Sequence, residues 1–566
     1  MCKLSNEILF EIFDYLTFPD KQVCIRVCKK WRHLMLGYNY YEKLDIKYLD
    51  FLNKYFQKNE SRRNQVQCLR VWFHRTSVSY NFNGADGVLA LPEQFPHLRE
   101  FVLDHASEDT NDSDFDELVI DKRVAEHWQK VTKFYNYFEK YCLSSKLLEH
   151  DGFLNLVDLK VKFWEGEFAR RSESKCVALI KQISKAPKLE ILKLSHGKMS
   201  QGHLDHLNRN AKKLQVLWLV DMDLASTNVN RASQTNSSSD ILTELRLFNC
   251  TKEFNESMLK IMEYPNLKML KVYSTKLQEK YGEGELIKFV SCCQYLKNYN
   301  VNIHPITPAI MKAMDTRGIK LEELAIMSLP DADHPDQIKS LLASEQKDSV
   351  LKLELSYSDD CEKKEIKVGK TIDSLKDFPK LEQLKMIGNK TCSIDSLPRF
   401  PVDEFLKTCE NLKTLELQYW KTKIGSKLVK PMSFLRSEKK FTAKLKSLVL
   451  VGVEYCDKSM GFISETCPEL SKLTITITSQ HRARYCCDID FPNHSFTSIT
   501  VNNLRSCYYQ VTKEKETKWY KFAYQTIEEV AEDKLSELER EDTKLHFLKY
   551  KSCAVLKLEG TRDIWV

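Results

Sequence analysis

Few side chains in this chain of 566 residues have a spacing that metal, cofactor or covalent chemistry would use. His203 and His206 are close in sequence, but no Cys-x-x-Cys pair and no metalloprotease-type glutamate accompanies them. Gly282 and Gly284 lack the third glycine of a dinucleotide loop, and the Gly-Asn-Lys-Thr run at Gly388 lacks the upstream glycine of a phosphate loop. We therefore expect no catalytic residue, no metal and no cofactor, and a function that depends on binding.

Composition narrows the classes of partner. The formal net charge of +7 results from 86 Lys and Arg against 79 Asp and Glu along the whole chain, which argues against a nucleic-acid partner. No apolar stretch approaches the roughly 20 residues of a membrane span, and acidic residues interrupt the candidate core of a signal peptide. The 18 cysteines are scattered, so we expect free thiols, no membrane partner and a location in the cytoplasm, the nucleus or both.

The first forty residues have the pattern of short amphipathic helices. One apolar stripe contains Leu4, Ile8, Leu9, Ile12, Phe13 and Leu16. Proline in the Pro19-Asp20 turn ends this helix, and a second helical run carries Val23, Val27, Cys28 and Trp31, of which we expect Cys28 to lie in the core. Such short helices bury little surface among themselves, so we expect another protein to cover the stripe.

This stretch resembles the F-box family. The resemblance lies in Leu4-Ser5-Asn6-Glu7-Ile8-Leu9, Ile12-Phe13-Asp14-Tyr15-Leu16, Pro19-Asp20 and Val27-Cys28-Lys29-Lys30-Trp31, with Ser5 where most members have proline. In the family this face binds the Skp adaptor of a cullin-RING ubiquitin ligase. The adaptor-binding residues that the resemblance implies are Leu4, Ile8, Leu9, Ile12, Phe13, Leu16, Val27 and Trp31. The alternative is that these helices cap the core of the next domain.

From Val66 onward the pattern L-x-x-L-x-L, with other apolar residues at some positions, returns every 25 to 33 residues. The hits at Val131, Leu296 and Phe496 are weak, and a further weak candidate begins at Cys553. This period is typical of leucine-rich repeats, and stretches such as Cys467-Pro468-Glu469-Leu470 resemble the cysteine-containing repeats of intracellular leucine-rich proteins. We predict an α/β fold, in which a short all-helical F-box precedes a curved leucine-rich-repeat solenoid with a parallel sheet on its concave face.

The predicted domains are the F-box at residues 1–45 and the solenoid at 46–566, with about 15–17 repeats. Three stretches depart from the period: an acidic loop at 105–117, a Ser/Asn-rich loop at 226–240 and a charged segment at 503–552. We expect the last segment to form a terminal cap with an amphipathic helix carrying Ile527, Val530, Leu535 and Leu538. The alternative is that this segment is a separate binding element.

Alternation along the strands predicts a second surface. With Leu192 and Leu194 in the core, Lys193 points to the concave face, because successive strand side chains face opposite ways. The equivalent and next outward positions give a predicted substrate-binding set of Lys160, Lys193, Trp218, Arg246, Phe248, Lys271 and Tyr273, with Lys162 beside it. Later repeats place Ala325, Glu354, Glu416 and Thr474 at the equivalent position, so the positive charge is local and favours an acidic or phosphorylated protein partner. A solvated face is the alternative.

Together these features predict a substrate-recognition subunit of an SCF-type ubiquitin ligase. The F-box would bind the Skp adaptor and the cullin-RING module, and the repeats would bind a target protein for ubiquitin-dependent degradation. The main alternative is a leucine-rich-repeat scaffold or receptor that has no link to ubiquitin. An extracellular recognition protein is a third hypothesis, which the scattered cysteines disfavour.

Overall fold

A computed structural model describes residues 9, 24, 26–37, 43–46, 63–73, 88–105, 120–137, 142–163, 169–224, 237–274, 282–327, 334–357, 364–388, 397–424, 441–455, 457–477, 488–503, 507–513, 516–523, 526–531 and 545–559. The chain divides into two compact units, Met1–Gln294 and Tyr295–Val566. Both combine α-helices with long sheets in which parallel pairing dominates, an arrangement consistent with a solenoid. None of the helices described is long and apolar enough to cross a membrane.

The L-x-x-L-x-L pattern marks the start of the regularly spaced strands of the long sheets, from β2 to β22. Leu189 is followed two residues later by strand β6 (Ile191–Ser195), whose Leu192 and Leu194 are fully buried. The register repeats from strand to strand, so that Leu192 stands opposite Leu217 of the next strand. Full burial of each such side chain contributes about 1.5 to 3 kcal/mol, and stacking adds these contributions along a continuous core.

The first unit contains one long parallel sheet. Its strands follow the order β1 (Lys43–Ile46), β2 (Cys68–Phe73), β3 (Glu100–His105), β4 (Lys133–Asn136), β5 (Asp158–Lys162), β6, β8 (Val216–Val220), β11 (Glu244–Phe248) and β13 (Met269–Tyr273). Two short parallel pairs join β7 (Lys198–Met199) to β9 (Asp223–Leu224) and β10 (Ser237–Ser238) to β12 (Met262–Glu263). The helical segments are α3 (Lys29–Gly37), α7 (Leu91–Gln94), α8 (Lys122–Trp128), α9 (Leu143–Glu149), α10 (Ala169–Lys181), η2 (Ile183–Lys185), α11 (Gln201–Asn210), α12 (Lys252–Ile261) and α13 (Glu283–Cys292).

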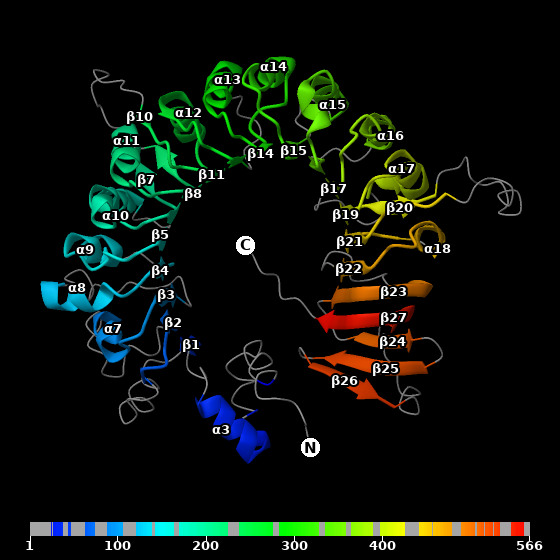
Figure 1. Ribbon diagram of the computed structural model, residues 1–566, viewed down its shortest axis with the longest axis horizontal. Coiled ribbons are helices and arrows are strands. Elements are labelled where there is room, and N and C mark those ends of the chain that lie inside the picture. The colour runs from blue at the N-terminus through cyan, green and yellow to red at the C-terminus, as the bar shows by residue number, and fades with distance from the viewer. Residues whose placement is uncertain are drawn as a thin grey trace, which may run out of the picture. The chain divides into compact units, whose positions relative to one another are not determined.

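Strand β1 was not predicted. Its Leu44 is buried and stands opposite Leu69 of β2, so parallel pairing starts before the first predicted repeat. Within this unit, helices α7 to α13 lie along one face of the sheet (Figure 1). We call the other face, to which the residue between the two buried leucines points, the open face. A cluster of aromatic rings, in which Trp128 contacts Phe101, Phe134 and Phe153, fills the helix-covered side.

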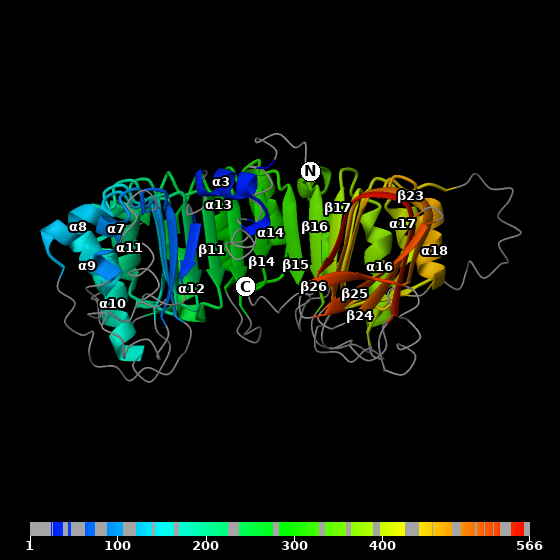
Figure 2. The ribbon, with the colours of Figure 1, turned by 90° about the horizontal axis from the view of Figure 1, so that it is seen from below.

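The second unit continues the same strand pattern and then changes it. Its sheet order is β14 (Asn298–Val301), β15 (Glu323–Met327), β16 (Lys352–Ser356), β17 (Gln383–Ile387), β19 (Thr414–Gln418), β21 (Ser447–Val451), β22 (Lys472–Ile477), β23 (Asp488–Asn503), β27 (Leu545–Glu559), β24 (Cys507–Lys513), β25 (Glu516–Ala523) and β26 (Thr526–Val530). A short parallel pair joins β18 (Arg399–Pro401) to β20 (Lys421–Lys423). The helices are α14 (Pro308–Thr316), α15 (His334–Leu342), η3 (Glu345–Asp348), α16 (Lys364–Leu375), α17 (Val402–Thr408) and α18 (Asp457–Thr466). Figure 2 shows strands β14, β15, β16 and β17 of this unit side by side.

The expected amphipathic helix near the C-terminus is wrong where the structure describes it. Ile527 and Val530 belong to strand β26, which pairs antiparallel with β25, because cross-strand pairing outweighs the helical spacing of these two residues. Leu535 and Leu538 lie outside the described residues. The two last hits of the repeat pattern stand opposite each other on long strands, Phe496 on β23 and Cys553 on β27.

Two predicted loops fall largely outside the description. Of the acidic stretch 105–117 only His105 is described, and it ends strand β3. Of the Ser/Asn-rich stretch 226–240 the final residues 237–240 are described, and Ser237 and Ser238 form strand β10 rather than loop. Their parallel partner is β12, so this part of the stretch is tied to the next repeat.

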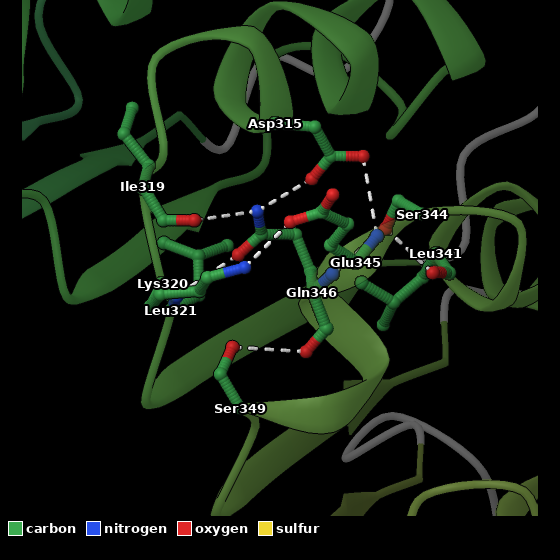
Figure 3. Close-up of polar contacts among 9 residues, drawn as sticks. All are labelled: Asp315, Ile319, Lys320, Leu321, Leu341, Ser344, Glu345, Gln346 and Ser349. Atoms are coloured by element: carbon green, nitrogen blue, oxygen red, sulfur yellow. Dashed lines mark hydrogen bonds and ion pairs between the residues drawn. The ribbon is translucent and has the colours of Figure 1, made fainter.

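One repeat of the second unit is closed by a buried glutamine (Figure 3). The Gln346 side chain donates from Nε2 to Asp315 Oδ1 and to the Ile319 carbonyl, both at 2.8 Å. Its Oε1 accepts from the Leu321 backbone N–H at 2.9 Å. One side chain thus satisfies backbone groups just before β15 that would otherwise be buried without partners. On the outer side of the same site, Lys320 pairs with the exposed Glu345 at 2.6 Å.

Candidate functional site

The structure describes three of the eight predicted adaptor-binding residues. Leu9 is helical and fully buried, Trp31 is partly buried on α3, and the Val27 side chain is 60% exposed. An apolar side chain so exposed at this place is available to a partner. The other five residues lie outside the described part of the chain: Leu4, Ile8, Ile12, Phe13 and Leu16.

Cys28 does not lie in the core, contrary to the sequence-based expectation. It is exposed, and its Sγ accepts a hydrogen bond from the Trp31 backbone N–H at 3.4 Å. The spacing from Val27 to Trp31 spans one helical turn, and the structure turns Cys28 outward together with Val27. The cysteine therefore contributes to the surface of the F-box region.

The predicted residues of the first unit come together on the open face. Register places Lys160 of β5 beside Lys193 of β6, and Lys193 beside Trp218 of β8. Trp218 stands beside Arg246 of β11, which stands beside Lys271 of β13. We call these five residues the basic row. Their neighbours Leu159, Leu192, Leu217, Leu245 and Leu270 are buried on the opposite side, which confirms the predicted alternation.

Trp218 lies at the centre of the row and contacts a cation on either side. The Arg246 guanidinium carbon lies 4.1 Å from the centre of the indole ring, and Lys193 Nζ lies 5.1 Å from it. The negative face of an indole attracts cations at such distances. At the β4 end, Lys160 Nζ lies 3.8 Å from the ring centre of Tyr135, an aromatic neighbour that the sequence analysis did not include.

Two carboxylates beside cations of the row were also missed. Asp158 accepts a hydrogen bond from the Tyr135 hydroxyl at 2.7 Å and lies 3.6 Å from Lys160 Nζ. Burial, together with this bond to Asp158, raises the pKa of Tyr135. On β11, Glu244 accepts from Trp218 Nε1 at 2.7 Å and forms an ion pair with Arg246. Both acids stand two residues before a row cation on the same strand, a spacing that places them on the same face.

Lys193 differs from these two cations. Among the described residues, no carboxylate forms an ion pair with it. Its pKa is lowered by burial first and then by the positive charges of Lys160 and Arg246. The middle of the row therefore carries positive charge that neighbouring acids do not balance.

Aromatic surface adjoins the cations, as predicted. Phe248 and Tyr273 follow the row cations Arg246 and Lys271 by two residues and stand opposite each other on β11 and β13. Their ring centres lie 6.4 Å apart, and Tyr273 is 38% exposed. Lys162 occupies the corresponding place on β5 and is exposed. All seven predicted substrate-binding residues thus lie on one face, while their role in binding stays a prediction.

In the equivalent row of the second unit, one lysine lies between two glutamates. Lys385 of β17, which the sequence analysis omitted, lies between Glu354 and Glu416 at 3.4 and 3.8 Å. Ala325 is buried, and Thr474 stands opposite Val449. Reading the same position in every repeat would have included Lys385. Unbalanced positive charge of the kind found around Lys193 is therefore not repeated at these positions.

The histidine and glycine motifs have structural explanations. His203 Nδ1 lies 2.8 Å from Ser200 Oγ and closes a capping box at the start of α11. Gly388 follows β17 directly, at a place where a Cβ atom would collide with the Tyr419 carbonyl, so close backbone approach requires glycine there. In the part of the chain that the structure describes, no group of three or more His, Cys, Asp or Glu side chains could hold a metal ion.

Comparison with known proteins identifies one domain. Residues 1–43 match the F-box domain family, a match that supports membership of the F-box family. No curated protein sequence matches the chain. The F-box indicates a Skp-binding role within SCF complexes, whose F-box subunits are generally non-catalytic.

Proposed function

We propose that this protein is the substrate-recognition subunit of an SCF-type ubiquitin ligase. It binds the Skp adaptor of the cullin-RING module through the F-box and presents a target protein for ubiquitin-dependent degradation. The observation that carries the proposal is the F-box domain at residues 1–43. The exposed apolar side chain of Val27 in this domain supports it, because covering this side chain with a partner would remove apolar surface from water and so favour binding.

The remainder of the chain supplies the target-binding part. We assign its units to leucine-rich repeats, a proposal supported by the strands that begin two residues after the pattern hits from Val66 to Leu470 and by the buried leucines. Stacked units offer a long open face on which side chains at equivalent positions form rows. The basic row is the surface of this kind that we assign to target binding.

The contribution to catalysis is proximity. The ligase module supplies the charged ubiquitin, and the repeats hold target lysines near it, which raises their effective concentration. We propose action in the cytoplasm, the nucleus or both, with protein partners rather than nucleic acid or membrane. No bond-making residue of this chain is required.

The adaptor assignment is tested with Val27→Asp. We expect this variant to lower the affinity for the purified Skp adaptor more than tenfold. The complex would no longer bury the valine side chain, and it would bury an unpaired carboxylate in its place. The affinity is measured by calorimetry, and cullin is followed by co-purification. Ile241→Asp is the matched control, since Ile241 is 41% exposed outside the F-box.

The double variant Ile8→Ala with Leu9→Ala is the second arm. It is expected to weaken adaptor binding more than tenfold by removing apolar surface, and circular dichroism checks that it stays folded, since Leu9 is buried. If folded samples of both variants bind the adaptor at the wild-type level, the ligase assignment fails. The chain would then be a repeat scaffold or receptor unconnected with ubiquitin.

A further inference from the structure

We infer that the centre of the basic row, formed by Lys193, Trp218 and Arg246, is a docking site for an anionic side chain in an extended acidic segment of a partner protein. The inference rests on the proposed function only in identifying this partner as a ligase target. The site itself is defined by charge and geometry within the first unit.

Acids that could balance the row cations are distributed unevenly among its strands. Two residues before the row, register aligns Asp158, Ile191, Val216 and Glu244 on β5, β6, β8 and β11. On β5 and β11 this position holds an acid, which serves Lys160 or Arg246. On β6 and β8, which lie between them, it holds Ile191 and Val216, and on β13 it holds Met269, so none of these three side chains can balance a charge. Lys193 is thus the cation between the two acid-bearing strands whose own strand offers an apolar neighbour in place of an acid.

In the free protein, the surroundings of Lys193 disfavour its positive charge. Burial and the charges of Lys160 and Arg246 all lower its pKa, so its ammonium group is held in an unfavourable surrounding. An anion placed beside it would relieve this repulsion. Because Ile191 and Val216 border the place, little water would screen the new ion pair. The indole of Trp218 contacts both Lys193 and Arg246, and these contacts fix the positions of the two cations relative to each other.

The spacing of the strands and the aromatic residues beside the row indicate the length and polarity of the ligand. Five neighbouring strands from β5 to β13 span about 19 Å at the usual spacing, which an extended peptide covers with about six residues. The exposed ring of Tyr273, beside Phe248, adjoins the row at its β13 end. The preferred segment therefore carries acid in its middle and an apolar residue toward one end. Carboxylate and phosphate share the required charge, and either can supply it.

A protein segment fits this surface better than nucleic acid. Asp158 and Glu244 lie on the same face as the row, and they would repel a continuous chain of phosphates. The net charge of +7 on 566 residues offers no broader positive surface. A short peptide can place one or two charges between these acids, which a regular phosphate backbone cannot do.

The test uses three fluorescein-labelled hexapeptides and the full-length protein. Gly-Glu-Glu-Glu-Phe-Gly is the acidic probe, and versions with Gln or with phosphoserine at the three central acidic positions are compared by fluorescence anisotropy. We expect the Gln peptide to bind at least tenfold more weakly than the acidic probe. Tighter binding of the phosphoserine peptide would identify phosphate as the preferred source, and equal or weaker binding would identify carboxylate.

Variants then locate the site. Lys193→Glu is expected to weaken binding of the acidic probe at least tenfold, whereas Lys193→Arg retains it. Lys212→Glu is the matched control, because Lys212 is exposed between α11 and β8 and the charge change is identical. Equal binding of the acidic and Gln probes, equal effects of Lys193→Glu and Lys212→Glu, or tighter binding of a single-stranded RNA hexamer would overturn the inference.

Adaptor affinity is measured on the same preparations. Wild-type protein that binds the acidic probe but not the Skp adaptor would leave the docking site standing and refute the proposed function. The reverse result would refute the docking site alone. The two proposals therefore fail separately.

Discussion

At the scale of single residues, the surroundings of each lysine decide what it can do. Lys385 lies between two glutamates, and Lys160 faces Asp158, so both are already paired within the protein. Lys193 has the same side chain and the same place in its strand, but its neighbours are cations and an indole. The residue type alone therefore does not identify the binding position.

This difference predicts a pH dependence of acidic-peptide binding. A bound anion favours the charged form of Lys193, so affinity is full below the pKa of the free protein and falls as the pH rises through it. That pKa lies below the usual lysine value because of burial and of two neighbouring cations. The other charged groups on this face of strands β5 to β13 are Asp158, Lys160, Lys162, Glu244, Arg246 and Lys271.

Anisotropy titrations of the acidic probe from about pH 7 to about pH 10 measure the effect, since the probe's own carboxylates stay ionised throughout. Lys193→Arg is the control, because arginine keeps its charge over this range and its affinity should fall less. An identical pH profile for wild type and Lys193→Arg would contradict the assignment of the titration to Lys193.

At the scale of elements, the strands follow the sequence pattern closely while the segments between them vary. Most return as α-helices, and the segment between β15 and β16 adds the short helix η3, which carries Gln346, after α15. This glutamine is fully buried, and its amide bonds the Ile319 carbonyl and the Leu321 N–H, which lie between α14 and β15. A polar residue in the core is here part of the fold.

Gln346→Leu is therefore expected to destabilise the second unit. The substitution keeps most of the volume but leaves the Leu321 N–H and the Ile319 carbonyl buried without this partner, at a cost of about 1 to 3 kcal/mol for each group. Urea denaturation followed by circular dichroism measures the change in the unfolding midpoint. Lys320→Ala is the control, because it removes only an exposed ion pair and should leave the midpoint nearly unchanged. A midpoint for Gln346→Leu equal to that of the control would contradict this account.

At the scale of the whole molecule, the two proposed activities belong to different parts of the chain. The F-box occupies residues 1–43, and the basic row begins at Lys160, more than a hundred residues later. None of the contacts described above joins a residue of the F-box to a residue of the basic row. The two surfaces are therefore expected to bind their partners independently.

Crossing the two variants tests this independence. Val27→Asp should reduce adaptor affinity and leave acidic-peptide affinity within about twofold of wild type, while Lys193→Glu should do the opposite. In the double variant the two losses should equal those of the single variants. Loss of both activities in either single variant, with folding intact, would show that the surfaces are coupled.

The sequence by itself determined where strands begin and which side chains alternate across them. The spacing of leucines is enough for this, because a strand has a period of two and a buried pair such as Leu192 and Leu194 leaves only one direction for Lys193. The F-box motif was equally local, since its residues lie within forty positions. These features could be predicted without knowing any long-range contact.

Tertiary structure decided which charges are balanced and how the chain ends. Asp158 and Glu244 affect the row through contacts with neighbouring strands, so their effect on each cation depends on register. The helical spacing of Ile527 and Val530 yielded to pairing with β25, because β-structure is stabilised by residues distant in sequence. Cys28 turned outward although its motif suggested the core. A local pattern predicts which way a strand side chain points, whereas only the packed neighbours decide whether its charge is balanced.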